Sequence, residues 1–199
     1  MRILAFSDLH RDLDQAARLT EMSKDADLVI GAGDFASIHE GLGETVSALS
    51  GIETPTILVA GNNETVDDLR GAIGDWRSAR VLHGETTEIE GTTFFGLGGG
   101  IPVTPWDWSF DVDESEAEKL LGDLPEGAVL VVHSPPKGHC DEAGNGLRLG
   151  STAILGAIEE KQPVLAVCGH IHESWGKTSR IGETEVVNLG PAGRFFDLG

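Results

Sequence analysis

Side chains that can bind metal ions stand directly after short apolar runs of this sequence. The runs "ILAF", "LVI", "ILVA", "VLVV" and "VLAV" are each followed by carboxylate, imidazole or amide groups. These metal-competent residues are Asp8, His10, Asp34, Asn62, His133, His170 and His172. This nitrogen and oxygen set contains no thiolate, which suits Mn²⁺, Fe or Zn²⁺. Because the set exceeds what one catalytic metal normally takes, we expect two metals that share a bridging carboxylate.

The apolar runs are typical of strands that are covered on both faces. They span residues 3–6, 28–30, 57–60, 129–132 and 164–167. Helical spacing of apolar residues lies between several of them, as around Leu13, Val66 and Ile154. Alternating strands and helices indicate an α/β fold. In such folds the carboxyl ends of strands form one edge, so the metal-competent residues are expected to converge there.

Two further segments favour a second sheet. Residues 80–100 and the stretch from Trp175 to Phe196 contain brief β-like runs separated by turns with glycine. We therefore predict a four-layer α-β-β-α sandwich, in which two mixed sheets pack face to face and helices flank them. No repeat or linker divides the chain, so one domain over residues 1–199 is expected.

Local spacing adds detail to this predicted site. Residues i and i+2 of an extended chain point the same way, so Asp8 with His10, and His170 with His172, are each expected to address one centre. Gly33, Gly61 and Gly169 adjoin candidate ligands and let backbone approach closely without a Cβ. The segment 101–113 reads as a long loop with Trp106 and Trp108. Tryptophans beneath a loop more often anchor it, and a cap over a site is the alternative.

Composition limits the partners of this chain. The formal net charge is −19 and only five residues are lysine, which disfavours nucleic-acid binding through a basic groove. Two cysteines are too few for a disulfide framework. No apolar run approaches the ~18 residues needed to span a bilayer, and "MRILAF" is too short for a secretion signal. We expect a cytoplasmic protein without membrane contact. The sequence does not decide between a monomer and a homodimer.

The motifs from Asp8 to His172 resemble those of the calcineurin-like metallophosphoesterases, in the order of that family. "HSPPKG" and "CGHIHESWG" are similar to its small archaeal and bacterial members and to the metallophosphoesterase-domain phosphodiesterases. The resemblance implies that the first metal is held by Asp8, His10 and His172, the second by Asn62, His133 and His170, and that Asp34 bridges both. It also implies Mn²⁺ as the first choice of cation, with Fe, Zn²⁺ or Ni²⁺ as alternatives.

The activity implied by this resemblance is hydrolysis of a small phosphoester, with a metal-bridging hydroxide as nucleophile. A phosphodiester is expected before a phosphomonoester. Two alternatives stay open. A partner-binding scaffold could keep the fold without catalysis, although such proteins usually have damaged metal ligands. A nuclease of the same family is disfavoured by the acidic charge.

The sequence departs from the family at Asn63, where a histidine usually orients phosphate and protonates the leaving group. An amide can still donate a hydrogen bond to a phosphate oxygen, but it cannot give up a proton near neutral pH. Another histidine could supply that proton. His39, five residues after Asp34, is the favoured candidate, and His83 and His139 are alternatives.

Overall fold

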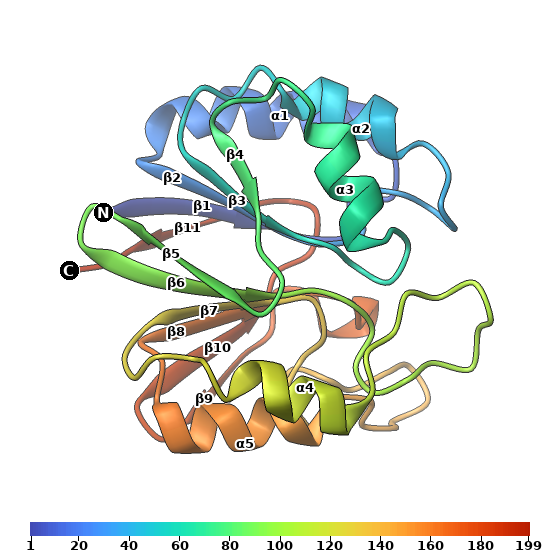
Figure 1. Cartoon of the computed structure of the whole chain (residues 1–199), viewed down its shortest axis with the longest axis vertical. Helices are drawn as coiled ribbons and strands as arrows, with labels where there is room; N and C mark the ends of the chain where they lie inside the picture. The colour runs from blue at the N-terminus through green and yellow to red at the C-terminus, as the bar shows by residue number, and fades with distance from the viewer.

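The apolar runs of the sequence form the central strands of two sheets in the computed structural model, which describes residues 1–199 (Figure 1). These strands are β1 (Arg2–Phe6), β2 (Leu28–Ala32), β3 (Thr56–Val59), β7 (Val129–Val132) and β8 (Leu165–Cys168). Apart from Arg2, all of their residues are buried. Coverage on both faces explains why these strands are apolar throughout rather than alternating.

The first sheet has five strands in the order β11-β1-β2-β3-β4. β4 (Ala79–Val81) continues the parallel set, whereas β11 (Arg194–Asp197) pairs antiparallel with β1. Three helices cover its outer face in Figure 1: α1 (Leu13–Met22), α2 (Leu42–Leu49) and α3 (Val66–Ile73). Asp12 and Thr65 cap the first turns of α1 and α3 by accepting hydrogen bonds from backbone N–H groups.

The second sheet has six strands in the order β5-β6-β7-β8-β10-β9. Its outer strands form two antiparallel pairs, β5 (Glu85–Ile89) with β6 (Thr92–Leu97), and β9 (Thr178–Ile181) with β10 (Thr184–Asn188). The helices α4 (Glu114–Leu121) and α5 (Thr152–Lys161) cover the face that points away from the first sheet. Two short 3-10 helices complete the chain, η1 (Ser23–Asp25) and η2 (His172–Ser174).

An apolar layer joins the inner faces of the two sheets. Side chains such as Ile3, Ile30 and Val59 of the first sheet pack with Phe94 and Val131 of the second, and all of these are fully buried. One apolar cluster lies between the first sheet and its helices, and another lies between the second sheet and its helices. The predicted four-layer sandwich of two mixed sheets flanked by helices is confirmed.

The last strand was not anticipated. The hairpin predicted after Trp175 is formed by β9 and β10. The next strand, β11, pairs instead with β1 of the first sheet, where Phe196 lies opposite Ile3. Without β11, β1 would be an edge strand with unpaired backbone groups. This pairing joins residues at the two ends of the chain, so no local pattern could signal it. None of the helices combines the length and the apolar character that crossing a bilayer requires.

Candidate metal centre

All of the predicted metal ligands gather where the central strands end, at the edge where several long loops meet (Figure 1). Six of them form two groups of three, in each of which the ligand atoms lie within 4.8 Å of one another. The first group is Asp8, His10 and His172, and the second is Asp34, His133 and His170. The second group is the more buried of the two, whereas His172 in the first group is exposed to solvent.

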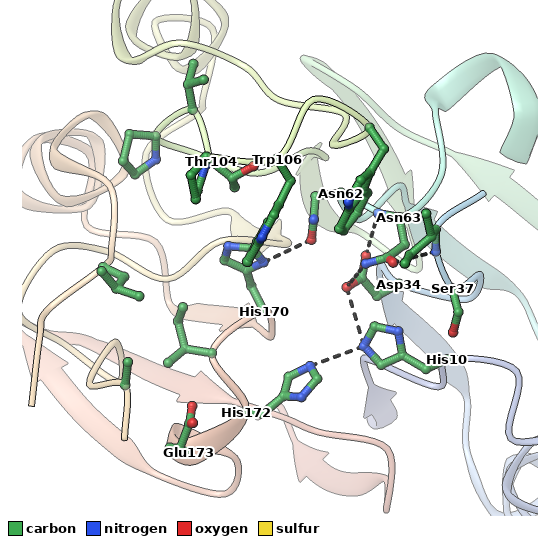
Figure 2. Close-up of a pocket in the computed structure, with 18 residues that line it drawn as sticks. His10, Asp34, Ser37, Asn62, Asn63, Thr104, Trp106, His170, His172 and Glu173 are labelled. Carbon is green, nitrogen blue, oxygen red and sulfur yellow. Dashed lines mark hydrogen bonds and ion pairs between the residues drawn. The ribbon is translucent and has the colours of Figure 1, made fainter. Parts of the chain in front are cut away.

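Asp34 lies between the two groups and turns one carboxylate oxygen toward each. Its Oδ2 is 3.5 Å from His10 Nε2 (Figure 2). Its Oδ1 is 3.5 Å from His133 Nε2. Asn62 completes the second group, because its Oδ1 is 3.3 Å from His133 Nε2 and 3.1 Å from His170 Nδ1. The placement of Asp34 is the one that a carboxylate bridging two cations requires.

The facing ring nitrogens fit divalent cations. His10 Nε2 and His172 Nε2 are 3.1 Å apart, and neutral imidazoles at that distance either share one proton or direct both lone pairs at a cation. Backbone carbonyls favour a proton on Nδ1 of two rings, because His10 Nδ1 lies 3.2 Å from Ala36 O and His133 Nδ1 lies 2.8 Å from Ala32 O. Such contacts leave each Nε2 free as a ligand.

One expectation from local spacing is wrong. His170 and His172 do not address the same centre, because His170 joins Asp34 and His133 while His172 joins Asp8 and His10. Residues i and i+2 point the same way only on an extended backbone, but His170 adopts the left-handed region with φ 67°, and η2 begins at His172. The turn between them sends the two rings to different groups.

Charges at the centre are balanced between Asp34 and its histidine neighbours. Burial alone would raise the pKa of Asp34, but His133 and His10 lower it well below its ordinary value. Burial alone would lower the pKa of His133, but the Asp34 carboxylate raises it to about 9. Burial, assisted by the neighbouring His133, lowers the pKa of His170 to about 3. The centre therefore holds an ionised Asp34 carboxylate, a neutral His170 and a protonated His133, and a cation that binds His133 Nε2 would have to displace its proton.

Asn63 holds the Asp34 carboxylate in place. Its backbone N–H donates to Asp34 Oδ1 at 2.9 Å, and its side-chain Nδ2 donates to Asp34 Oδ2 at 2.8 Å. Its Oδ1 accepts a hydrogen bond from the Ile38 N–H at 2.8 Å. The amide thus links Asp34 to the loop after β2, and a phosphate oxygen would have to use the remaining N–H of Nδ2.

Glu64 organises the backbone around the same carboxylate. It is almost fully buried, and it accepts hydrogen bonds from the N–H groups of Gly61, Asp34 and Ala36 at 2.7 to 3.0 Å. Burial raises the pKa of Glu64 to about 7, and the charge of Asp34 adds to the rise. No role for Glu64 was predicted from the sequence, although its place close to Asn62 could have drawn attention to it.

Asp8 is held by donors that were also not predicted from the sequence. Its Oδ1 accepts from the His170 N–H at 3.0 Å, and its Oδ2 accepts from Trp175 Nε1 at 3.1 Å and from the hydroxyl of Ser7. Ser7 precedes Asp8 in the chain, but Trp175 comes from the end of η2. These contacts fix the carboxylate in the first group.

Asn188 supports the turn that carries His170 and His172. Its buried Nδ2 donates to the carbonyls of Gly169 at 3.0 Å and Ile171 at 3.2 Å. Asn188 ends β10, and its residue type alone carries no signal for this role. Only the structure identifies it.

All three predicted glycines are required for close packing around the ligands, and a Cβ on Gly33 would lie 2.5 Å from His133 Nδ1. The other two glycines lie against carboxylates. A Cβ on Gly61 would lie 2.0 Å from Asp34 Oδ1 and 2.2 Å from the Asp34 nitrogen. A Cβ on Gly169 would lie 2.4 Å from Asp8 Oδ2. Both glycines therefore allow a neighbouring strand end to place its carboxylate against the backbone.

The candidate proton donors lie at different places. His39 is exposed, does not line the pocket beside the metal ligands, and its Nε2 lies 2.5 Å from the carbonyl oxygen of Trp108. His139 Nδ1 lies 2.7 Å from Ser179 Oγ, and His83 Nδ1 accepts weakly from the Gly98 N–H. A catalytic role for His39 stays a prediction, but its ring has a structural contact with the loop 101–113.

A pocket of about 610 Å³ opens above the metal ligands. The loop 101–113 forms one wall, with Trp106 half exposed and pointing toward His170 (Figure 2). Trp108 lies against Trp106 with ring centroids 5.5 Å apart and an angle of 13° between the rings. Trp106 thus lines a site and does not serve as a buried anchor beneath its loop.

The loop is tied to a metal ligand through Ser109. Asn62 Nδ2 donates to Ser109 Oγ at 3.0 Å, and Ser109 Oγ donates to Asp111 Oδ1 at 2.7 Å. We expect Ser109→Ala to weaken metal binding at the second group about tenfold, because partners of metal ligands typically contribute ~10 to 100-fold in affinity. Calorimetric titration with Mn²⁺ measures this. Ser47→Ala, at an exposed position of α2, is the control, and equal affinities in the two variants would contradict the role of Ser109.

Comparison with known proteins places the chain in one family. The model of the calcineurin-like phosphoesterase superfamily domain matches residues 1–197. UPF0046 protein T07D4.2 of Caenorhabditis elegans is 33% identical over 131 residues, which are 61% of this chain and 31% of the relative. Human metallophosphoesterase domain-containing protein 1 is 36% identical over 95 residues, 45% of this chain and 29% of the relative. The chain thus matches less than a third of the length of either relative.

A solved structure shows the same fold over nearly the whole chain. The protein TT1561 of Thermus thermophilus superposes with a TM-score of 0.77 at 20% identity, and the match covers 96% of this chain and 90% of that one. The family model, which matches residues 1–197, leads to one assignment. The chain belongs to the calcineurin-like phosphoesterase superfamily.

Proposed function

We propose that this protein hydrolyses a small phosphodiester with two divalent cations, of which Mn²⁺ is the first choice and Fe, Zn²⁺ or Ni²⁺ are alternatives. The observation that carries the proposal is the position of Asp34, with one oxygen directed at each ligand group. Members of the superfamily normally bind two divalent metals. When bound, such cations activate a water molecule and stabilise the charge that develops on the phosphate.

The side chains of the protein prepare this site in three ways. Asn63 and Glu64 hold Asp34 and its backbone in the bridging position. Backbone carbonyls orient the rings of His10 and His133 so that each Nε2 faces the centre. The loop 101–113 forms one wall of the pocket. Preorganised ligands of this kind lower the reorganisation that binding and reaction require.

The charge of the pocket supports a diester before a monoester. None of the residues that line it is lysine or arginine, and Glu173 adds a carboxylate at its rim. A phosphomonoester carries about one more negative charge than a diester near neutral pH, as its second pKa is about 6. Without basic side chains, only the cations would balance that additional charge, so the singly charged diester fits better.

Hydrolysis of matched aryl esters tests this proposal. Protein freed of metal should bind two Mn²⁺ per chain by calorimetry, and the loaded protein should cleave bis(p-nitrophenyl) phosphate at least ten times faster, in kcat/KM, than p-nitrophenyl phosphate. A faster monoester would overturn the choice of diester. Binding of fewer than two ions without hydrolysis would favour the partner-binding scaffold instead.

The scaffold and the nuclease both have less support than the diesterase. A scaffold has no need of a complete ligand set, yet every predicted ligand lies at the centre, Asn62 included. A nuclease would need cationic side chains along a phosphate backbone, and the pocket offers none. The cytoplasmic location, the absence of membrane contact and the option of a homodimer stay predictions.

A further inference from the structure

The pocket is larger than a phosphate group requires and its outer wall is apolar. Its volume of about 610 Å³ falls in the ~300 to 1,000 Å³ typical of sites that enclose drug-sized molecules. The wall opposite the first ligand group comes from the loop 101–113 and from the loop between β7 and α5, through Val103, Trp106 and Leu149. The metal ligands therefore take the phosphate end, and a second region is left for the organic part of a substrate.

Exposed apolar side chains are concentrated at this wall. Val103 is 61% exposed, Trp106 49% and Leu149 43%, although a folded chain normally buries such residues. Trp108 stacks on Trp106, so it covers one face of that indole and leaves the other open. Figure 2 shows the Trp106 ring directed toward His170, at the phosphate end of the pocket. A flat apolar surface thus stands beside the place where a phosphorus atom would sit.

Hydrogen bonds hold this wall in position. Asp111 Oδ2 accepts from the N–H of Thr104 at 2.8 Å and from its hydroxyl at 2.9 Å. The Phe110 N–H donates to the carbonyl of Asn62 at 2.9 Å. A contact between His39 Nε2 and the Trp108 carbonyl fixes the far side of the tryptophan pair. A wall that is already ordered loses little conformational entropy when a ligand binds against it.

We propose that the substrate carries an uncharged, planar aromatic group that stacks on the open face of Trp106. This inference rests on the proposed phosphodiesterase function and names the class of its substrate. Stacking between an aromatic side chain and a flat ring strengthens binding about 5- to 150-fold. No lysine or arginine lines the pocket, so a second phosphate or a carboxylate on the aromatic group would find no cationic partner there. The carboxylate of Glu173 would also repel it.

Phosphonates separate ring binding from hydrolysis, because they are not cleaved. Phenylphosphonate should bind the Mn²⁺-loaded protein about tenfold more tightly than methylphosphonate in calorimetry, since 1.4 kcal/mol corresponds to a factor of ten. Trp106→Ala should remove this advantage and leave methylphosphonate affinity unchanged, and Trp106→Phe should restore most of it. Val164→Ala, at an exposed position remote from the pocket, should behave as wild type.

Four outcomes would overturn the inference. Equal affinities for phenyl- and methylphosphonate in the wild type would remove the aromatic subsite. A phenyl advantage that survives in Trp106→Ala would place the ring elsewhere, and tighter binding of octylphosphonate would indicate an aliphatic chain. Tighter binding of 4-carboxyphenylphosphonate than of phenylphosphonate would contradict the uncharged class.

Kinetics then distinguish this inference from the proposed function. Methyl p-nitrophenyl phosphate and phenyl p-nitrophenyl phosphate share a leaving group and differ only in the group that stays on phosphorus. The phenyl ester should have a kcat/KM about tenfold higher in the wild type and equal to the methyl ester in Trp106→Ala. If phenylphosphonate binds more tightly through Trp106 but neither ester is cleaved, the aromatic subsite is supported and the proposed phosphodiesterase function is wrong.

Discussion

Asp34→Asn should lower diester hydrolysis by at least about 10³-fold and reduce the number of bound metal ions per chain. The carboxylate lies between both ligand groups, so its charge is the one that balances two cations at once. Several kcal/mol of charge stabilisation depend on it, and each 1.36 kcal/mol corresponds to a factor of ten in rate. The asparagine would also turn an NH2 group toward Asn63, whose N–H groups now donate to both carboxylate oxygens.

Metal analysis of the purified variants checks this expectation beside the kinetics. His172→Ala should lose the first ion and keep the second, because His172 belongs to one group only. Asp75→Asn makes the same chemical change at an exposed position and should retain both ions and full activity. Two ions per chain and normal turnover in Asp34→Asn would show that Asp34 does not bridge.

Gly61→Ala should have the largest structural effect among glycine-to-alanine changes next to the predicted metal ligands. The new Cβ would lie 2.0 Å from Asp34 Oδ1 and 2.2 Å from the Asp34 nitrogen, and the second of these atoms belongs to the backbone. Neither strand end can move freely, because Glu64 accepts hydrogen bonds from the N–H groups of both Gly61 and Asp34. We expect the free energy of unfolding to fall by about 3 kcal/mol, the upper end of ordinary overpacking.

Urea unfolding of the metal-free protein measures this change, and calorimetry should show Mn²⁺ affinity at least a hundredfold weaker. Gly71→Ala is the matched control, since a Cβ at that helical position meets nothing within 4 Å. There the substitution should raise stability by about 0.5 to 1 kcal/mol, because alanine loses less conformational entropy than glycine in a helix. Similar effects at both positions would mean that the contact at Gly61 is not tight.

Much of the fold follows from local sequence patterns. Apolar runs of three or four residues predicted the buried strands, and each strand was placed to within one or two residues. Gly61 and Gly169 were recognised next to their ligands, since close approach requires the absence of a Cβ. The ligands themselves follow from residue chemistry, because carboxylates, amides and imidazoles at strand ends share one sheet edge.

Local patterns failed where long-range contacts decide the structure. The pairing of β11 with β1 joins the two ends of the chain, and no turn signal specifies it. The helices α2 and α4 were not predicted, although α3 has the same length of eight residues and was predicted. Local spacing placed His170 and His172 at one centre, whereas the family resemblance assigned them to different metals. The packing of their turn against Asp8 and Asn188 separates them.

The sequence by itself determined which side chains could bind metal, the layers of the fold and the edge where the site lies. Only the tertiary structure decided that Asn63 holds Asp34, that Glu64 accepts three backbone N–H groups, and that Trp106 lines the pocket. The physical reason is that hydrophobic periodicity and backbone freedom act over a few neighbouring residues. Hydrogen bonds and pocket walls instead join side chains from distant loops, whose meeting depends on how both sheets pack.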